Sequence, residues 1–507
     1  MNMRVKKILL ATLALVLLFG SSQVQKSLNR DRDRLELTRV QPLENAPPVL
    51  AFTTMALGGF RGLISNALWI RATDLQDDDK FFEMAQLADW ITKLEPHFVQ
   101  VWLVQSWNMA YNISVKFKDF PDRWRWVKRG IELLRDEGLH YNPNEMLIYR
   151  ELGWFFQHKL GQNLDDANMY YKQQWANEMA VVFDKKKPNL DELINPKTAD
   201  QTNRVRLLVD KYKMDPRFMK EVDDRYGPLD WRLPEAHAVY WACKGLEAAK
   251  QNPSKVNKED LITLRRVVYQ SMQLSFQRGR LVVNPFAKAF DLAPNLEIIP
   301  KVSTAYEQAA REDEKNHDHI LRAHRNFLRD AVYFLYEYNR VADSKAWYKY
   351  LAANYPDKTI IDGDTNSFPA NVPFEKYVLS RFSVDVTETD RSRVMAGIEG
   401  LLVNSYMSLV IDEDDHAAGY KIMARQLWDT YMSKIPKERS EAIGLKPLAE
   451  IDREIQNRLL DPENGFPPEA RAILRAKLGL PKESAKPPPG SSASPAQPTD
   501  RAEAKNP

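Results

Sequence analysis

Apolar residues recur at intervals of three and four along most of this chain, from about residue 50 to residue 480. The clearest case is the stretch 94–114, LEPHFVQVWLVQSWNMAYNIS, where apolar side chains would cover most sides of a helix. A period near 3.6 residues is typical of helices that bury a face, whereas strands alternate with a period of two. The spacing therefore predicts an all-α protein.

Prolines and glycines indicate where several of these helices begin and end. We expect one helix to follow Pro143 and to end at Gly161, and another to begin at Pro234 in PEAHAVYWACKGLEAAK. Proline suits the first turn of a helix because its missing N–H has no helical partner there. A third, long helix is expected to start near Ser303 and to run past His324.

The first 25 residues have the pattern of an export signal. MNMRVKK is basic, and no charged residue occurs from Ile8 to Gln25. The segment 1–25 is either a cleaved signal peptide or a retained signal-anchor, since the apolar run is short for a spanning helix, which needs about 20 residues. We favour an anchor through residues 8–22. The basic start then predicts a cytoplasmic N-terminus, with the rest of the chain across the membrane.

The composition excludes several classes of protein. Lys and Arg number 72 against 69 Asp and Glu, so no basic excess argues for a nucleic-acid partner. The one cysteine, Cys243, cannot form an intramolecular disulfide or a multi-cysteine zinc site. The chain carries no nucleophile elbow, kinase signature, HExxH or Rossmann fingerprint. We therefore expect a binding protein without cofactor or metal.

Pro96 is followed six residues later by the large aromatic Trp102, and Pro143 is followed in the same way by Tyr149. After Tyr149 come a leucine and then Gly153, which resembles the first helix of a tetratricopeptide repeat. The glycine would let a neighbouring helix approach. The two prolines are 143 − 96 = 47 residues apart, against about 34 in that repeat. We therefore expect a divergent tetratricopeptide-like solenoid.

Shifts in composition divide the chain into segments. The polar stretch KKKPNLDELINPKTADQT reads as a loop, residues 357–373 resist a helical interpretation, and the last 27 residues hold seven prolines and almost no large apolar side chain, which predicts disorder. The expected order is a signal or anchor at 1–25, a polar linker at 26–48, a helical repeat region at 49–184, a polar loop or insertion at 185–202, a continuing helical region at 203–356, a C-terminal helical region at 357–480 and a disordered tail at 481–507.

A closer likeness spans most of residues 50–250. ALGGFRGLISNALWIRA, LADWITKLEPHFVQVWLVQSWNMAYNIS, RWRWVKRGIELLRDEG and GPLDWRLPEAHAVYWA resemble a family of uncharacterised bacterial membrane-anchored proteins with tetratricopeptide-like repeats. Members of this kind are similar to proteins of planctomycete and verrucomicrobial genomes. The resemblance implies an envelope location and a helical repeat fold, and it supplies no activity and no catalytic residues. Together with the expected anchor, this location predicts a single-pass protein of a bacterial inner membrane whose body faces the periplasm.

The aromatic-rich stretch 94–114 would either line a peptide groove or pack between helices, and its match to the repeat pattern favours packing. Asn108 and Asn112 are better groove candidates, because amides one turn apart can hold a peptide backbone. Arg123, Arg125 and Arg129 follow closely. They would meet an acidic partner or form a solvated face.

The stretch GPLDWRLPEAH holds Asp230, Arg232 and His237. This constellation is either a binding site or an ion pair with helix capping, and we favour the second. His317 and His319 lack the spacing of a helical zinc pair, so a polar helix start explains them.

Two short patterns that suggest ligand sites also have structural explanations. GGFRGL, residues 58–63, lacks the Lys-Ser/Thr ending of a phosphate loop. We expect Gly58 and Gly62 to allow close helix packing, with an interfacial helix near the anchor as an alternative. DEDDH, residues 412–416, lacks the features of a calcium loop and suits the acidic first turn of a helix.

These features together predict a membrane-anchored envelope scaffold that binds protein partners through a helical-repeat surface and performs no catalysis. The alternative is an envelope hydrolase or transferase with unrecognised catalytic carboxylates. A third hypothesis is a metal-dependent protein that uses His317 and His319.

Overall fold

The computed structural model is 77% helical and 2% strand, which confirms the all-α class. It divides into two compact units, Met1–Ile113 and Ser114–Pro507, and each is described by itself. The described residues are 12, 16–17, 19–28, 30–31, 61–183, 188–251, 253, 256–284, 289–382, 391–433, 435 and 445–482. Most of the expected linker 26–48 and nearly all of the expected tail 481–507 lie outside these residues.

The expected anchor also falls largely outside the described residues. Residues 12, 16–17 and 19–28 are helical, and the apolar side chains of Val16, Leu17 and Phe19 are exposed. Among the helices in the described ranges, none combines the length and the apolar character needed to cross a bilayer.

The first unit is a helical hairpin continued by a further helix. Ala88, Ile91 and Val101 form its core, and Leu68 and Trp69 pack against them. Its elements are α3 (Arg61–Asp77), α4 (Phe81–Leu94), α5 (Val99–Trp107) and the π-helical segment η2 (Asn108–Ile113).

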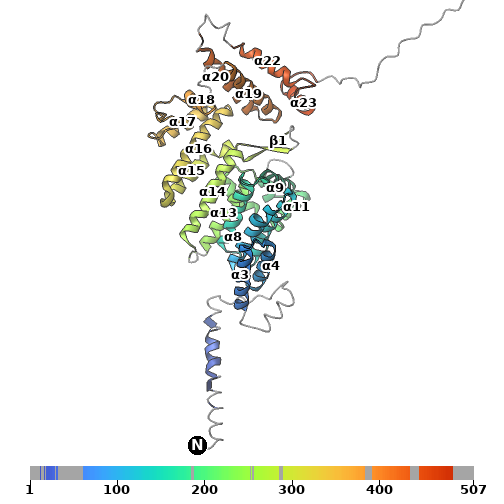
Figure 1. The fold of residues 1–507 in the computed structure, drawn as a ribbon, viewed down its shortest axis with the longest axis vertical. Coiled ribbons are helices and arrows are strands. Elements are labelled where there is room, and N and C mark those ends of the chain that lie inside the picture. The colour runs from blue at the N-terminus through green and yellow to red at the C-terminus, as the bar shows by residue number, and fades with distance from the viewer. Residues whose placement is uncertain are drawn as a thin grey trace, which may run out of the picture. The chain divides into compact units, whose positions relative to one another are not determined.

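The first half of the second unit is built on three adjacent helices, α8, α13 and α14 (Figure 1). Helix α8 and its π-helical continuation η5 run parallel to α14, because Arg150 in α8 pairs with Asp260 and Gln157 in η5 bonds to Gln270 further along α14. The elements are η3 (Ser114–Lys116), α6 (Phe120–Glu132), η4 (Leu133–Gly138), α7 (Leu139–Tyr141), α8 (Met146–Trp154), η5 (Phe155–Gly161), α9 (Asn168–Val182), α10 (Leu190–Ile194), α11 (Ala199–Asp210), α12 (Pro216–Tyr226), α13 (Pro234–Gln251) and α14 (Lys258–Arg278).

The second half continues as a succession of helical hairpins, with α14, α15, α16 and α17 each packed on the next, and with α19 packed on α20 (Figure 1). The elements are η7 (Leu296–Ile298), α15 (Ile299–Glu312), η8 (Glu314–Asn316), α16 (His317–Glu337), α17 (Val341–Asn354), α18 (Phe374–Phe382), α19 (Arg391–Val410), α20 (Asp414–Ser433), α22 (Leu448–Leu459) and α23 (Pro468–Lys477).

Several local predictions are confirmed. The helix after Pro143 ends at Gly161, although its last seven residues are π-helical, and α13 begins at Pro234. No helix occurs between α17 and α18, as the stretch 357–373 indicated. The acidic stretch 412–416 opens α20 with an acidic first turn.

Glycine packing was predicted correctly at one position and wrongly at another. A Cβ added to Gly153 would lie 3.3 Å from both the carbonyl oxygen of Ala238 and Cγ1 of Val267, so this glycine does let α13 and α14 approach. A Cβ at Gly62 would meet nothing within 4 Å, so Gly62 supports no close helix contact. Gly58 lies outside the described residues.

Two other expectations were wrong, and a short β-hairpin was not predicted. The long helix from Ser303 past His324 is two helices, because the side chain of Asp313 accepts hydrogen bonds from the backbone and side chain of Asn316 and caps a new turn. The polar segment 185–202 contains α10 and the start of α11, where Thr198 forms a capping box. A short antiparallel hairpin pairs β1 (Arg280–Asn284) with β2 (Ala289–Ala293), Arg280 opposite Ala293 and Val282 opposite Asp291.

The two proline–aromatic segments adopt the same local geometry. Nε1 of Trp102 donates a 2.9 Å hydrogen bond to the carbonyl of Pro96, and the hydroxyl of Tyr149 donates a 2.7 Å bond to that of Pro143. The residue before each proline has φ and ψ of −128° and 67° in the first case and −132° and 62° in the second. Each α-helix that follows has nine residues and continues as a π-helix.

Candidate interaction surface

The two asparagines proposed for a peptide groove lie between helices of the first unit. Asn108 is buried, and its amide donates a 3.2 Å hydrogen bond to the carbonyl of Phe81 in α4. Asn112 is half-buried and donates to the side-chain oxygen of Asn108. The amide of Gln105, one turn earlier, donates to the carbonyl of Ala85. These amides join α4 to α5 and η2, so Asn108 does not face a partner in this structure.

The three arginines of α6 that were predicted to bind a partner differ in exposure: Arg123 is half-buried, and Arg125 and Arg129 are exposed. Arg123 donates to the carbonyl of Phe117 at 2.8 Å and pairs with Asp165 at 3.1 Å, which holds it against the protein. The side chain of Arg125 is 80% exposed and that of Arg129 is 47% exposed. Their ion pairs with Asp122 and Glu137 lie at the surface. Such pairs stabilise a fold by less than about 1 kcal/mol, so both guanidiniums stay available to a partner.

Asp165, the partner of Arg123, is the centre of a half-buried polar cluster. Its carboxylate accepts hydrogen bonds from Lys159 at 2.7 Å, from the hydroxyl of Tyr171 at 3.2 Å and from the backbone N–H of Ala167 at 2.9 Å. Burial opposes ionisation of Asp165, but the bonds from Lys159 and Ala167 outweigh it and lower the pKa to about 2. This cluster fixes the turn between η5 and α9, and the sequence analysis did not identify it.

The corner before α13 carries the second predicted constellation. Arg232 forms a bidentate ion pair with Asp230, with N–O distances of 2.7 and 2.9 Å, and the carboxylate of Asp230 also accepts a hydrogen bond from the backbone N–H of Leu281. The pairing favoured from the sequence is therefore confirmed. It does not cap α13, because the carboxylate accepts the N–H of Arg232 and not a helix N–H. Both side chains are largely buried.

His237 lies inside the second unit. Its Nε2 is 2.8 Å from the carbonyl oxygen of Trp231, and its ring stacks on Phe156 and meets Trp175 edge to face. Burial lowers the pKa of His237 to about 4, so the imidazole is neutral at physiological pH. A neutral, enclosed ring of this kind packs between helices and is not presented to a partner.

A buried charge cluster near His237 also escaped the sequence analysis. The carboxylate of Glu235 lies 3.7 Å from Nε of Arg278, and burial raises the pKa of Glu235. Lys172 is fully buried, donates to the carbonyl of Gln162 and to the side chain of Asn168, and has its pKa lowered by burial to about 8. These charges hold the segment between η5 and α9 against α13 and α14. The only sequence signal was an acidic residue in the first turn of α13.

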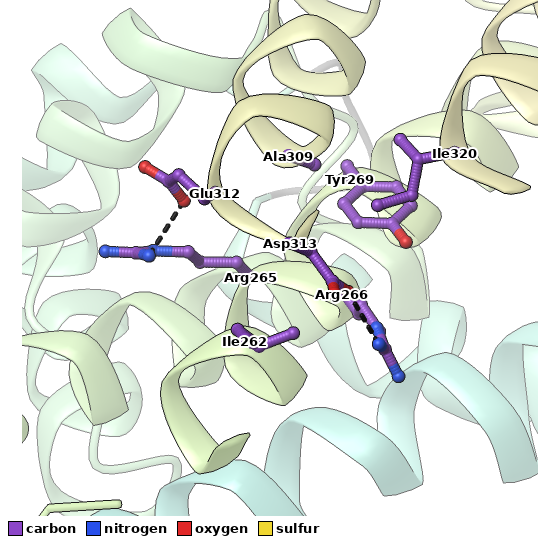
Figure 2. Close-up of a pocket in the computed structure, with 8 residues that line it drawn as sticks. All are labelled: Ile262, Arg265, Arg266, Tyr269, Ala309, Glu312, Asp313 and Ile320. Atoms are coloured by element: carbon purple, nitrogen blue, oxygen red, sulfur yellow. Dashed lines mark hydrogen bonds and ion pairs between the residues drawn. The ribbon is translucent and has the colours of Figure 1, made fainter. Parts of the chain in front are cut away.

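Figure 2 shows a small cavity between α14 and the end of α15. Arg265 pairs with Glu312 at 2.8 Å, and Arg266 pairs with Asp313 at 2.6 Å. The cavity has a volume of about 10 Å³, which is room for one water molecule at most. The paired arginines therefore join two helices and do not surround a ligand.

A larger depression of about 610 Å³ opens at the corner between α15 and α16. It contains His317 and His319, together with Glu314 and Asp318. The Nδ1 atom of His317 lies 2.9 Å from the carbonyl of Ala310, and this residue starts α16. Within the described residues, no three His, Cys, Asp or Glu side chains are grouped so as to hold a metal ion.

Comparisons with protein-family models, with curated proteins and with solved structures found no significant match for this chain.

Proposed function

We propose that this protein is a membrane-anchored scaffold of a bacterial cell envelope, which binds protein partners through the surface of a divergent helical-repeat solenoid. The observation that carries the proposal is the recurrence of one local structure at an interval of 47 residues, with Trp102 and Tyr149 in equivalent positions. Units that recur in this way bury their apolar faces by stacking on one another, and they leave an extended surface for partners.

The packing of α6 on α9 supports this proposal. The rings of Phe120 and Tyr170 lie 6.0 Å apart, and those of Trp124 and Tyr171 also lie 6.0 Å apart. Further along both helices, Lys128 pairs with Glu178 at 2.7 Å, so α6 and α9 run parallel. In the chain, α6 follows the proline–aromatic helix α5, and α9 follows the proline–aromatic helix α8. In stacked helical hairpins, the second helices of successive hairpins pack parallel to one another.

The exposed face of α6 is the best candidate for the binding surface. Of the site residues expected from the sequence, Arg125 and Arg129 project furthest into solvent. Arginine is enriched in protein interfaces because its planar guanidinium can bind a carboxylate through two hydrogen bonds. The partner that suits this face is therefore a protein with a cluster of Asp or Glu side chains.

Affinity purification after crosslinking in cells tests the proposal, with Arg125→Glu as the variant and Lys250→Glu as the control. The two positions are closely matched: Arg125 is 80% exposed and Lys250 is 69% exposed, and each pairs with an acidic residue three positions earlier. We expect one dominant envelope partner that is recovered with the parent chain and with Lys250→Glu, and that is lost with Arg125→Glu.

Two results would contradict the proposal. Recovery of no specific partner would argue against a scaffold. Equal recovery from both variants would show that the exposed face of α6 is not the binding surface.

A further inference from the structure

Three arginines of α16 lie along one side of that helix. Arg322, Arg325 and Arg329 are spaced i, i+3 and i+7, and residues at this spacing share a helix face. We call these three residues the α16 arginine stripe. Arg322 is exposed, Arg325 is half-buried and Arg329 is buried. Seven residues of helix extend roughly 10 Å, so the stripe is longer than a single small anion.

The buried end of the stripe meets a fourth arginine and a carboxylate. The guanidinium of Arg329 donates a 2.8 Å hydrogen bond to Oδ2 of Asp362, and Nη1 of Arg381 in α18 lies 3.8 Å from the same oxygen. Arg381 also pairs with Asp330 at 2.6 Å. Asp362 belongs to the segment between α17 and α18, and its side chain is 81% exposed. One oxygen of an exposed side chain is therefore shared between two guanidinium groups.

The cluster carries more positive charge than these two carboxylates balance. Within the part of the chain that the structure describes, neither Arg322 nor Arg325 forms an ion pair, and Nε of Arg325 is buried without a hydrogen-bond acceptor. Burial lowers the pKa of Arg325, and the positive charges of Arg329 and Arg322 lower it further. Four guanidinium groups are thus set against two carboxylates, and a further anion would relieve the repulsion between them.

We propose that the α16 arginine stripe and Arg381 bind an acidic segment of a protein partner, which takes the place of Asp362. Asp362 shows that a carboxylate fits this position, and arginine binds carboxylates through charge-assisted hydrogen bonds.

The length of the stripe favours a segment with several carboxylates. An extended chain advances about 3.3 Å per residue, so acidic side chains two or three residues apart match the length of the stripe, whereas one inorganic phosphate does not span it. The proposal deepens the scaffold function by naming a second surface, on helices other than α6. It rests on that function only in assigning the acidic segment to a protein partner.

A fluorescein-labelled peptide of six glutamates is the probe, and its fluorescence anisotropy is followed as the full chain is added in detergent at low salt. The variant is Arg322→Gln, and the matched control is Arg206→Gln. Both residues are exposed arginines within helices, α16 and α11, and neither has an ion-pair partner among the described residues. Each substitution removes one positive charge, so a difference between the variants does not come from net charge.

We expect Arg322→Gln to weaken binding of the probe about fivefold, the effect of losing one surface charge pair, and Arg206→Gln to leave binding unchanged. Arg325→Gln should weaken binding at least as much. Its thermal denaturation midpoint should not fall, because the substitution removes a charge that its neighbours repel. Asp362→Asn should instead tighten binding, because it removes the carboxylate that competes with the probe.

Three results would overturn the proposal. The first is an absence of probe binding by the parent chain. The second is an equal loss of binding in Arg322→Gln and Arg206→Gln, which would show attraction to net charge alone. The third is an unchanged affinity in Asp362→Asn, which would show that the probe and this carboxylate do not compete.

The test separates this proposal from the scaffold function. Loss of probe binding in Arg125→Glu, with no change in Arg322→Gln, would place the acidic peptide on α6; that result would overturn the second surface and leave the scaffold intact. Binding of the probe by the α16 arginine stripe, together with recovery of no partner from cells, would contradict the scaffold function and not the acidic specificity of the stripe.

Discussion

Replacing Gly419 by alanine should separate α20 from the end of α16. A Cβ at this position would overlap the backbone carbonyl of Glu337, the last residue of α16. An ordinary carbon–oxygen contact needs about 3.3 Å, and a backbone carbonyl at a helix end cannot rotate away as a flexible side chain can. The two helices must therefore move apart.

The loss of stability follows from what this junction holds together. Overpacking of this kind costs about 1–3 kcal/mol. Separation also weakens the bidentate pair of Arg280 with Glu413, at 2.7 and 2.9 Å, and the stacking of His416 on Tyr338 at 4.0 Å, each worth about 1 kcal/mol. Alanine recovers about 1 kcal/mol through its higher helix propensity. The net loss is about 2–3 kcal/mol, so local opening of α20 becomes roughly 50-fold more frequent.

Hydrogen exchange of the α20 amides measures this opening, and Gly400→Ala is the matched control. Gly400 also lies within a helix, α19, but a Cβ there would meet nothing within 4 Å. We expect α20 amides to exchange roughly 50-fold faster in Gly419→Ala, and Gly400→Ala to exchange like the parent chain or more slowly. Unchanged exchange in Gly419→Ala would refute the close approach of α20 to Glu337.

Two further predictions concern the interior. Removing the hydrogen-bonding group of a proline–aromatic pair should lower the free energy of unfolding. The loss should be about 1 kcal/mol for Tyr149→Phe and larger for Trp102→Phe, because the buried Trp102 ring also loses volume. Urea denaturation midpoints equal to that of the parent would contradict this prediction. Burial lowers the pKa of His237 and of His324 from 6.5 to about 4. As the pH drops from about 6.5 to about 4, these two histidines are therefore protonated in the unfolded chain but not in the folded chain, and the free energy of unfolding falls. Denaturation over this pH range should show a weaker pH dependence in His324→Gln than in the parent, and an equal dependence would argue against a neutral buried imidazole.

Features that depend on neighbouring residues could be predicted from the sequence. The start of α13 at Pro234 and the end of the preceding long helix at Gly161 follow from backbone chemistry within one turn. The close approach at Gly153 could also be inferred, because the repeat pattern assigns a small residue to the point where two helices meet. Periodicity identified the helical class because most of these helices bury only one side.

Features that depend on residues far apart in the sequence could not be predicted. The exposed Arg125 and the half-buried Arg123 are two residues apart in the sequence. Their roles differ because Asp165, which is distant in the sequence, pairs with Arg123. Likewise, the side chain of Asn108 points inward because its amide donates a hydrogen bond to the carbonyl of Phe81, 27 residues earlier. The β1–β2 hairpin is held to α20 by Arg280, whose partner Glu413 is 133 residues away.

The central claim, that the exposed face of α6 binds a protein partner, is tested most directly by a photocrosslinking amino acid at position 125, with the same amino acid at position 250 as the control. The chain is expressed in its native membrane and irradiated in living cells. The account predicts one discrete crosslinked product at position 125, containing a protein with an acidic segment, and no product at position 250. No product at position 125, or the same products at both positions, would contradict it.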